Sequence, residues 1–174
     1  AWRGGDAASL SEKDAVTLSA AAGILSEVLS DSMSDLEKER AVYRWLCANV
    51  EYDWTHQDPQ TETPRESFEP YGALVNRTAV CLGFASGFQL LMDMAGIECI
   101  TVVGAAFQSR ENHAWNEVKL NGRWYCVDAT WDAGMDAPDC WSYFNVTSDW
   151  MADTDHQWDY QNVPEAITED GGVA

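Results

Sequence analysis

A cysteine at position 81 stands at the start of a segment that has the apolar spacing of an amphipathic helix. Gly96 follows the last turn of this segment, where glycine commonly ends a helix. The apolar residues that set the spacing are Phe84, Phe88, Leu91 and Ala95. The free N–H groups and the positive dipole end at a helix N-terminus favour an anion, and therefore a thiolate. We predict that Cys81 is a nucleophile, because a buried structural cysteine would fit better in mid-helix.

Two β-prone runs, 113–120 and 123–131, flank the dipeptide Asn121-Gly122. This dipeptide fits a type I′ two-residue turn, in which both central residues have positive φ. Leu120 is then expected to pair with Arg123. The sequence therefore predicts an antiparallel hairpin.

Counting back from this turn places a histidine and an aspartate on one face of the hairpin. Trp115 is expected to pair with Asp128. His113 is expected to pair with Thr130, so His113 and Asp128 become diagonal neighbours within reach of each other. Asp132 lies on the opposite diagonal, and spacing alone does not choose between the two aspartates. A carboxylate that holds an imidazole fixes its tautomer and supports the imidazolium once the ring has taken a thiol proton.

Four segments around these residues carry a family resemblance. They are YGALVNRTAVCLGFA (71–85), GIECITVVG (96–104), NHAWNEVKLNGRWYCVDATWD (112–132) and YFNVTSD (143–149). Together they resemble the bacterial transglutaminase-like superfamily, whose core has a papain-like fold, over roughly residues 35 to 160. The resemblance implies that Cys81 is the nucleophile, His113 the base and Asp128 the orienting carboxylate. The resemblance thus favours Asp128 over Asp132, a choice that the spacing alone leaves open.

The resemblance extends to the substrate groove. Tyr52 stands in the region from which transglutaminase relatives supply an aromatic hydrogen-bond donor to the oxyanion, although a tyrosine packed at a helix end is an equally good interpretation. The backbone N–H of Cys81, at the helix start, is a second oxyanion donor. Trp54, Trp115 and Trp131 lie close in sequence to these residues, and we expect them to wall a substrate channel.

The other histidines and the cysteines do not predict a metal site. His156, in the segment DHQWD, resembles a tail motif of bacterial relatives. One interpretation places it in the lining of the groove, but we favour a surface histidine near Trp158. His56 lies in a polar loop. Three histidines with scattered acids do not form a ligand cluster, and the cysteines lack paired short spacing, so we expect neither metal nor cofactor.

Length and composition indicate one catalytic domain. The chain has 174 residues and 46% hydrophobic content, and no linker or repeat divides it. We divide it into an N-terminal helical extension (1–33), a catalytic core (34–160) and a C-terminal tail (161–174). The formal net charge of −19 argues against nucleic acid as a partner, because there is no basic stripe for phosphates. The acidity indicates a solvated surface.

The remaining elements predict an α+β fold, with helices first and an antiparallel sheet later. Amphipathic helices are expected at 11–29 and 34–50, and Ser34 with Glu37 has the signature of a capping box. The other expected elements are a polar loop at 53–65, a short helix at 68–75, a strand at 97–105, a loop at 107–112 and a strand at 141–146. The active site would lie where the helices meet the sheet.

The cellular setting is inferred only indirectly. No stretch is long enough to span a membrane. The chain begins at Ala1 without methionine, which favours a mature form and an extracellular or cell-envelope location. If Cys81 stays free, the other cysteines form at most two disulfides, although buried free thiols are the better interpretation. They are Cys47, Cys99, Cys126 and Cys140.

These residues predict thiol-dependent acyl transfer through a thioester. The expected substrate is an amide bond of a peptide or protein, and hydrolysis by a peptidase or amidase is slightly favoured. This preference rests on a short, bacterial-looking chain without a calcium-loop pattern or an appended β-sandwich. Transamidation of glutamine is the alternative within the same chemistry. A peptide- or glycan-binding surface module without turnover is the alternative from another class.

Overall fold

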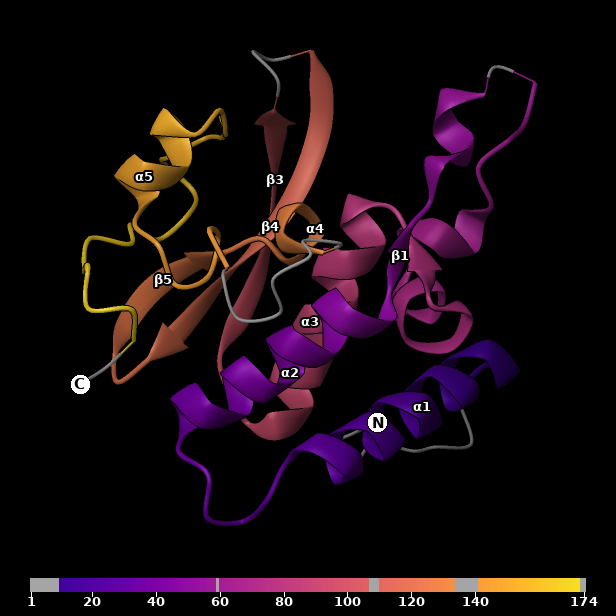
Figure 1. The fold of residues 1–174 in the computed structure, drawn as a ribbon, viewed down its shortest axis with the longest axis horizontal. Helices are drawn as coiled ribbons and strands as arrows, with labels where there is room; N and C mark the ends of the chain where they lie inside the picture. The colour runs from indigo at the N-terminus through magenta and orange to yellow at the C-terminus, as the bar shows by residue number, and fades with distance from the viewer. Residues whose placement is uncertain (1–9, 59, 107–109, 134–140, 173–174) are drawn as a thin grey trace.

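The fold consists of three long helices on one face of a three-stranded antiparallel sheet, with a C-terminal segment on the other face (Figure 1). It is a computed structural model that describes residues 10–58, 60–106, 110–133 and 141–172. The helices are α1 (Glu12–Val28), α2 (Asp35–Asn49), α3 (Cys81–Ala95), α4 (Ala129–Asp132) and α5 (Ser148–Asp153). The strands are β1 (Glu51–Tyr52), β2 (Thr78–Ala79), β3 (Cys99–Ala106), β4 (Glu111–Leu120) and β5 (Arg123–Val127). This architecture confirms the predicted α+β class.

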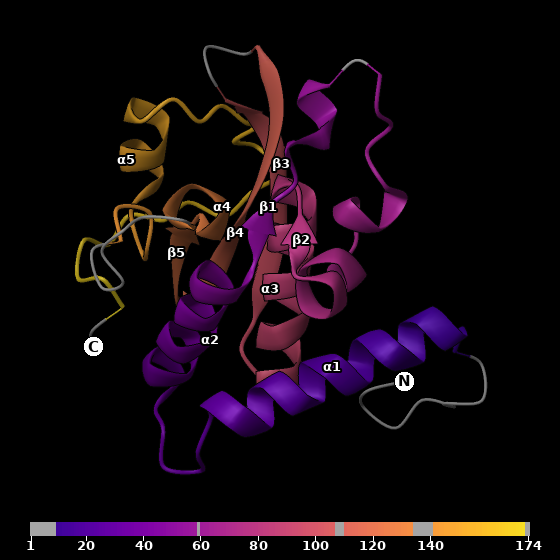
Figure 2. The same ribbon diagram turned by 45° about the vertical axis from the view of Figure 1, so that its right-hand side comes forward.

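The first two helices begin where the sequence indicates. Ser11 caps α1 by accepting a hydrogen bond from the backbone N–H of Asp14 (3.1 Å). Ser34 and Glu37 form the predicted capping box at the start of α2, because each accepts a hydrogen bond from the backbone N–H of the other (3.3 and 2.7 Å). Figure 2 shows α1 lying across the lower ends of α2 and α3.

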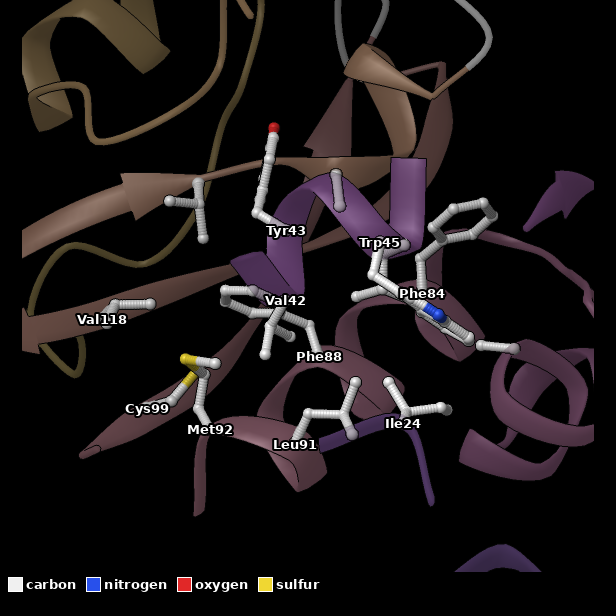
Figure 3. Close-up of a cluster of buried hydrophobic side chains, with 14 of the residues drawn as sticks. Ile24, Val42, Tyr43, Trp45, Phe84, Phe88, Leu91, Met92, Cys99 and Val118 are labelled. Atoms are coloured by element: carbon white, nitrogen blue, oxygen red, sulfur yellow. The ribbon is translucent and has the colours of Figure 1, made fainter. Parts of the chain in front are cut away.

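Helix α3 is the centre of the larger hydrophobic core. It packs against α2 and against strands β3 and β4. Its side chains Phe84, Phe88 and Leu91 are fully buried, and the Phe88 ring meets the Tyr43 ring of α2 edge to face with centroids 6.0 Å apart (Figure 3). The helix ends at Gly96, whose φ of 85° is readily adopted only by glycine.

The hairpin has the predicted turn and register near the turn, but β5 is shorter than predicted. Leu120 pairs with Arg123, and the last pair of the ladder is Asn116 with Val127. The prediction that Thr130 pairs in the ladder is wrong, because the chain turns into α4 after Val127. Asp128 ends the strand, because its carboxylate caps the N-terminus of α4.

Several connecting segments differ from the sequence prediction. Residues 141–146 are not a strand, because only Val146 forms a backbone bridge, to Cys126. The short helix expected at 68–75 is replaced by a 3-10 turn (Arg65–Phe68) and a π-helical turn (Gly72–Asn76). The expected loop at 107–112 ends early, because β4 begins at Glu111, and residues 107–109 lie outside the described residues. The conformation of these segments is determined by tertiary contacts, which the periodicity of the sequence does not reveal.

The described cysteines are free thiols. Cys47, Cys81, Cys99 and Cys126 form no disulfide, and Cys140 lies outside the described residues. In the part of the chain that the structure covers, no helix is long and apolar enough to cross a bilayer.

Two carboxyl groups are buried away from the candidate site. Glu39 of α2 is wholly buried, and one of its oxygens accepts a hydrogen bond from the Asn145 side chain (2.9 Å), while the other has no hydrogen-bond partner among the described residues. Burial raises the pKa of Glu39 to about 8, although the Asn145 hydrogen bond opposes the rise. Burial likewise raises the pKa of Glu117, on β4, to about 8. Both groups are therefore neutral in the folded protein at acidic and near-neutral pH.

We predict that Glu39→Gln flattens the dependence of stability on pH. The folded protein keeps a proton on Glu39 that the unfolded chain releases near pH 4.5, so the free energy of unfolding falls as pH rises from about 4.5 to about 8. The contribution of one such group is at most about 1.4 kcal/mol per pH unit. Urea unfolding at several pH values should give a smaller decline for Glu39→Gln. Exposed Glu62→Gln is the control, and equal slopes for the Glu39 variant and the native chain would contradict the prediction.

Candidate active site

Cys81 is held at the first position of α3 by the turn that precedes it. The residue before it, Val80, is extended, and its N–H donates to the backbone oxygen of Ser67 (2.9 Å). A Cβ on Gly83 would lie 2.3 Å from the same oxygen, so only glycine allows the 3-10 turn to lie this close to the helix. The Cys81 side chain is half-buried. The cysteine therefore has a fixed backbone and access to solvent.

Tyr52 lies beside the backbone of Cys81. The parallel pairing of β1 with β2 puts Tyr52 opposite Ala79, two residues before the cysteine. The Cys81 N–H donates a hydrogen bond to the Tyr52 hydroxyl oxygen. Burial and the nearby Cys81 and Glu111 raise the pKa of Tyr52 to about 12, so its phenol keeps its proton at neutral pH. Two donors, the tyrosine O–H and the cysteine N–H, thus lie next to each other.

His113 connects Cys81 with Asp128. It lies on β4 and is only 6% exposed. Its Nε2 lies 2.6 Å from Asp128 Oδ2, and the ring also forms a hydrogen bond with the Cys81 side chain. Burial lowers the pKa of His113, but the charge of Asp128 and the hydrogen bonds to Asp128 and Cys81 together raise it to about 9. The imidazolium is therefore the favoured form at neutral pH.

Asp128 is buried and bound on both carboxylate oxygens. Oδ1 accepts from the backbone N–H groups of Thr130 and Trp131 (2.9 and 3.3 Å), which are in the first turn of α4. Oδ2 lies close to His113 and also 3.2 Å from His156 Nε2. Burial raises the pKa of Asp128, but His113 and His156 outweigh it and lower the value to about 2. Asp128 is accordingly an anion throughout the physiological pH range.

The hydrogen-bond partners of Asp132 are different from those of Asp128 and do not include His113. It accepts hydrogen bonds from the Tyr43 hydroxyl (2.7 Å) and from the backbone N–H groups of Ser142 and Tyr143 (3.0 and 2.9 Å). These contacts join α4 to α2 and to the segment that follows residue 140. The structure thus places Asp128 against the histidine and Asp132 in the scaffold.

His156 is the functional candidate that the sequence interpretation misplaced. It was expected at the surface, but it is fully buried among the rings of Trp115, Trp131 and Tyr143, with centroids 4.3 to 5.7 Å away. The chain reverses after α5 at Asp155, which has a φ of 80°, and returns to the edge of β3. Only the resemblance of DHQWD to a tail motif could have drawn attention to it.

An aromatic pocket of about 570 Å³ opens beside His113. Its lining includes Tyr52, Trp54, Trp131 and Tyr143 together with the carboxylate-bearing Glu111. The expectation that Trp115 walls the channel is wrong. Trp115 is 1% exposed and its ring packs edge to face on Trp158 and His156, on the side of the sheet covered by the C-terminal segment.

A metal ion is not needed to explain the contacts of this site. Within the described residues, His113, Asp128 and His156 each offer a ligand atom, and these atoms lie within 4.8 Å of one another. Both histidine nitrogens already face the same Asp128 oxygen, which accounts for the cluster as a hydrogen-bonded group.

Comparison with known proteins relates the chain to one family. Residues 22–129 match the model described as the transglutaminase-like superfamily. Kyphoscoliosis peptidase of Mus musculus is 35% identical over 122 residues, and that of Homo sapiens is 34% identical over the same length. Each match covers 64% of this chain and 18% of the relative, so the chain spans about a fifth of the length of these relatives. A solved structure described as a TGase superposes with a TM-score of 0.60 at 15% identity, over 80% of this chain and 37% of the other.

We predict that Asp132→Ala destabilises the fold. The substitution removes the acceptor of the Tyr43 hydroxyl and of two backbone N–H groups, and we expect the free energy of unfolding to fall by about 2 kcal/mol. Urea denaturation followed by tryptophan fluorescence measures this loss. Asp31→Ala, in an exposed turn, is the matched control and should change stability by less than about 0.5 kcal/mol. A variant of Asp132 as stable as that control would show that these contacts do not hold the scaffold.

Proposed function

The chain belongs to the transglutaminase-like superfamily, and from that premise we propose that it is an enzyme that hydrolyses amide bonds of peptides or proteins through a cysteine thioester. The observation that carries the proposal is the hydrogen-bonded series Cys81, His113, Asp128, with 2.6 Å between the last two. A nucleophile, a base and a group that orients the base are the parts that such chemistry requires.

The proposed reaction begins with the Cys81 sulfur attacking the carbonyl carbon of the substrate amide. The thiol proton resides on His113, whose imidazolium form is stabilised by Asp128. As the carbonyl becomes an oxyanion, the Tyr52 O–H donates a hydrogen bond to it, and the Cys81 N–H exchanges its bond to the Tyr52 oxygen for one to the oxyanion. The tyrosine can serve as a donor because its raised pKa keeps the phenol protonated.

The tetrahedral intermediate collapses when His113 protonates the departing amine, which leaves an acyl group on Cys81 as a thioester. His113 is then neutral and removes a proton from water as the water attacks the thioester carbonyl. Cleavage of the C–S bond releases the carboxylic acid and restores the thiolate–imidazolium pair. Asp128 stays ionised throughout because its pKa is held near 2.

Hydrolysis is proposed over transamidation because water has access to the site. Cys81 is half-buried, and the pocket beside His113 has the exposed residues Glu111, Asn112 and Trp54 in its lining. A transamidase must protect its thioester from water until an amine arrives. The name peptidase, carried by relatives that are 34–35% identical over the matched region, supports the same preference.

The first prediction of this proposal is selective alkylation of Cys81. With iodoacetamide at neutral pH, Cys81 should be labelled at least about tenfold faster than Cys47, Cys99 and Cys126, because burial raises the pKa of these three thiols. Peptide mapping by mass spectrometry measures each rate. The rate at Cys81 should fall in His113→Ala and persist in Cys47→Ser. Equal labelling of all four thiols, unchanged in His113→Ala, would favour a binding module without turnover.

The second prediction concerns the products. Incubation with a glutamine-containing peptide library, with and without a small primary amine, should give chain cleavage or loss of ammonia, and Cys81→Ala should give neither. Mass spectrometry separates the outcomes, because cleavage shortens the peptide and deamidation leaves its length unchanged. Amine adducts that dominate at modest amine concentration would replace hydrolysis with transamidation as the activity.

A further inference from the structure

The Asp128 carboxylate serves two histidines through one oxygen. His113 Nε2 and His156 Nε2 lie 2.6 and 3.2 Å from Oδ2, and the two rings are tilted 55° to each other with centroids 5.3 Å apart. The other oxygen is occupied by the N-terminal N–H groups of α4. A carboxylate with acceptor sites filled from three sides has little freedom to rotate.

The surroundings of His156 assign its proton. A nitrogen that hydrogen-bonds to a carboxylate must carry hydrogen, so Nε2 is the donor. The opposite nitrogen, Nδ1, is buried and has no hydrogen-bond partner in the described part of the structure. An unpaired acceptor is less costly there than an unpaired N–H. Among the described residues, the His156 ring therefore forms one hydrogen bond, from Nε2 to Asp128.

The backbone of His156 and Gln157 is fixed by hydrogen bonds to α5 and to β3. The N–H and C=O of Gln157 form hydrogen bonds with the C=O and N–H of Ala105 on β3 (2.9 and 2.8 Å), and His156 N–H donates to the Met151 oxygen (3.1 Å). A Cβ on Gly104 would lie 2.1 Å from the Gln157 oxygen and 2.8 Å from the Trp115 ring. Glycine at position 104 is thus what lets the segment lie on the strand.

We propose that His156 is a positioning residue that holds Asp128 in the orientation His113 requires, and that the active site is incomplete without the segment that carries it. This inference rests on the proposed function. The segment lies beyond residue 129, where the match to the family model ends. Without the His156 N–H, Oδ2 loses one of its two donors and the carboxylate is freer to turn away from His113.

The test compares two substitutions of the same side chain. His156→Phe keeps a ring of similar size but removes the donor, whereas His156→Gln keeps an N–H near the position of Nε2. We expect kcat to fall about 10- to 100-fold in His156→Phe with KM within about twofold, and His156→Gln to recover most of the loss. Gln161→Ala, at an exposed position of the same C-terminal segment, is the control.

A second readout needs no substrate. The alkaline limb of the pH profile of Cys81 alkylation should shift downward in His156→Phe, since an Asp128 carboxylate that turns away from His113 supports the imidazolium less. A purely structural role would lower stability without moving this limb, and urea unfolding of each variant separates the two effects. Gly104→Ala should reproduce the His156→Phe result by displacing the segment.

The possible failures are distinguishable. If alkylation and turnover depend on His113 but are the same in His156→Phe and the native chain, the positioning role is overturned and the proposed function stands. If His156→Gln is as impaired as His156→Phe, the donor is not what matters, and the inference is also overturned. If alkylation of Cys81 depends on neither histidine, the proposed function fails and this inference fails with it.

Discussion

The burial of a negative charge at Asp128 is the constraint on which the rest of the site depends. A carboxylate removed from water is strongly unfavourable unless hydrogen-bond donors replace the water. Here the donors come from three different parts of the chain: β4 supplies His113, the start of α4 supplies two backbone N–H groups, and the segment after α5 supplies His156. The end of β5, the position of α4 and the return of the C-terminal segment all bring these donors to one point. The structure around the site is in this sense organised by the solvation of one anion.

Two aspartates four residues apart show how different two buried carboxylates in one short segment can be. Asp128 faces imidazole nitrogens and is held as an anion with a pKa of about 2. Asp132 is bound by a tyrosine hydroxyl and two backbone N–H groups, and burial raises its pKa. The first carboxylate supports charge on a histidine, whereas the second ties α2, α4 and the following segment together. Both carboxylates are buried in the same region, but only Asp128 faces His113.

The sequence predicted the features that depend on neighbours along the chain. Helix α3 follows from apolar spacing and a terminal glycine, the capping box from Ser34 and Glu37, and the hairpin from Asn121-Gly122. Counting residues along the hairpin placed His113 near both Asp128 and Asp132 but did not show which one it contacts. The two aspartates differ because helix α4 interrupts the strand after Val127. His156 and Trp115 were misplaced for a related reason. Their burial is produced by the C-terminal segment folding back on β3, a contact between residues about 50 positions apart that no local pattern records.

The cap that Asp128 places on α4 has an evolutionary consequence. The residue at this position must be short enough to accept hydrogen bonds from the N–H groups two and three residues later, and it must also carry a full negative charge. Asparagine, serine and threonine meet the first condition but not the second. Glutamate meets the second, but its longer side chain is a poor helix cap. Among the twenty amino acids only aspartate satisfies both demands. The set of residues tolerated at this position is therefore smaller than helix capping alone, or pairing with a histidine alone, would allow.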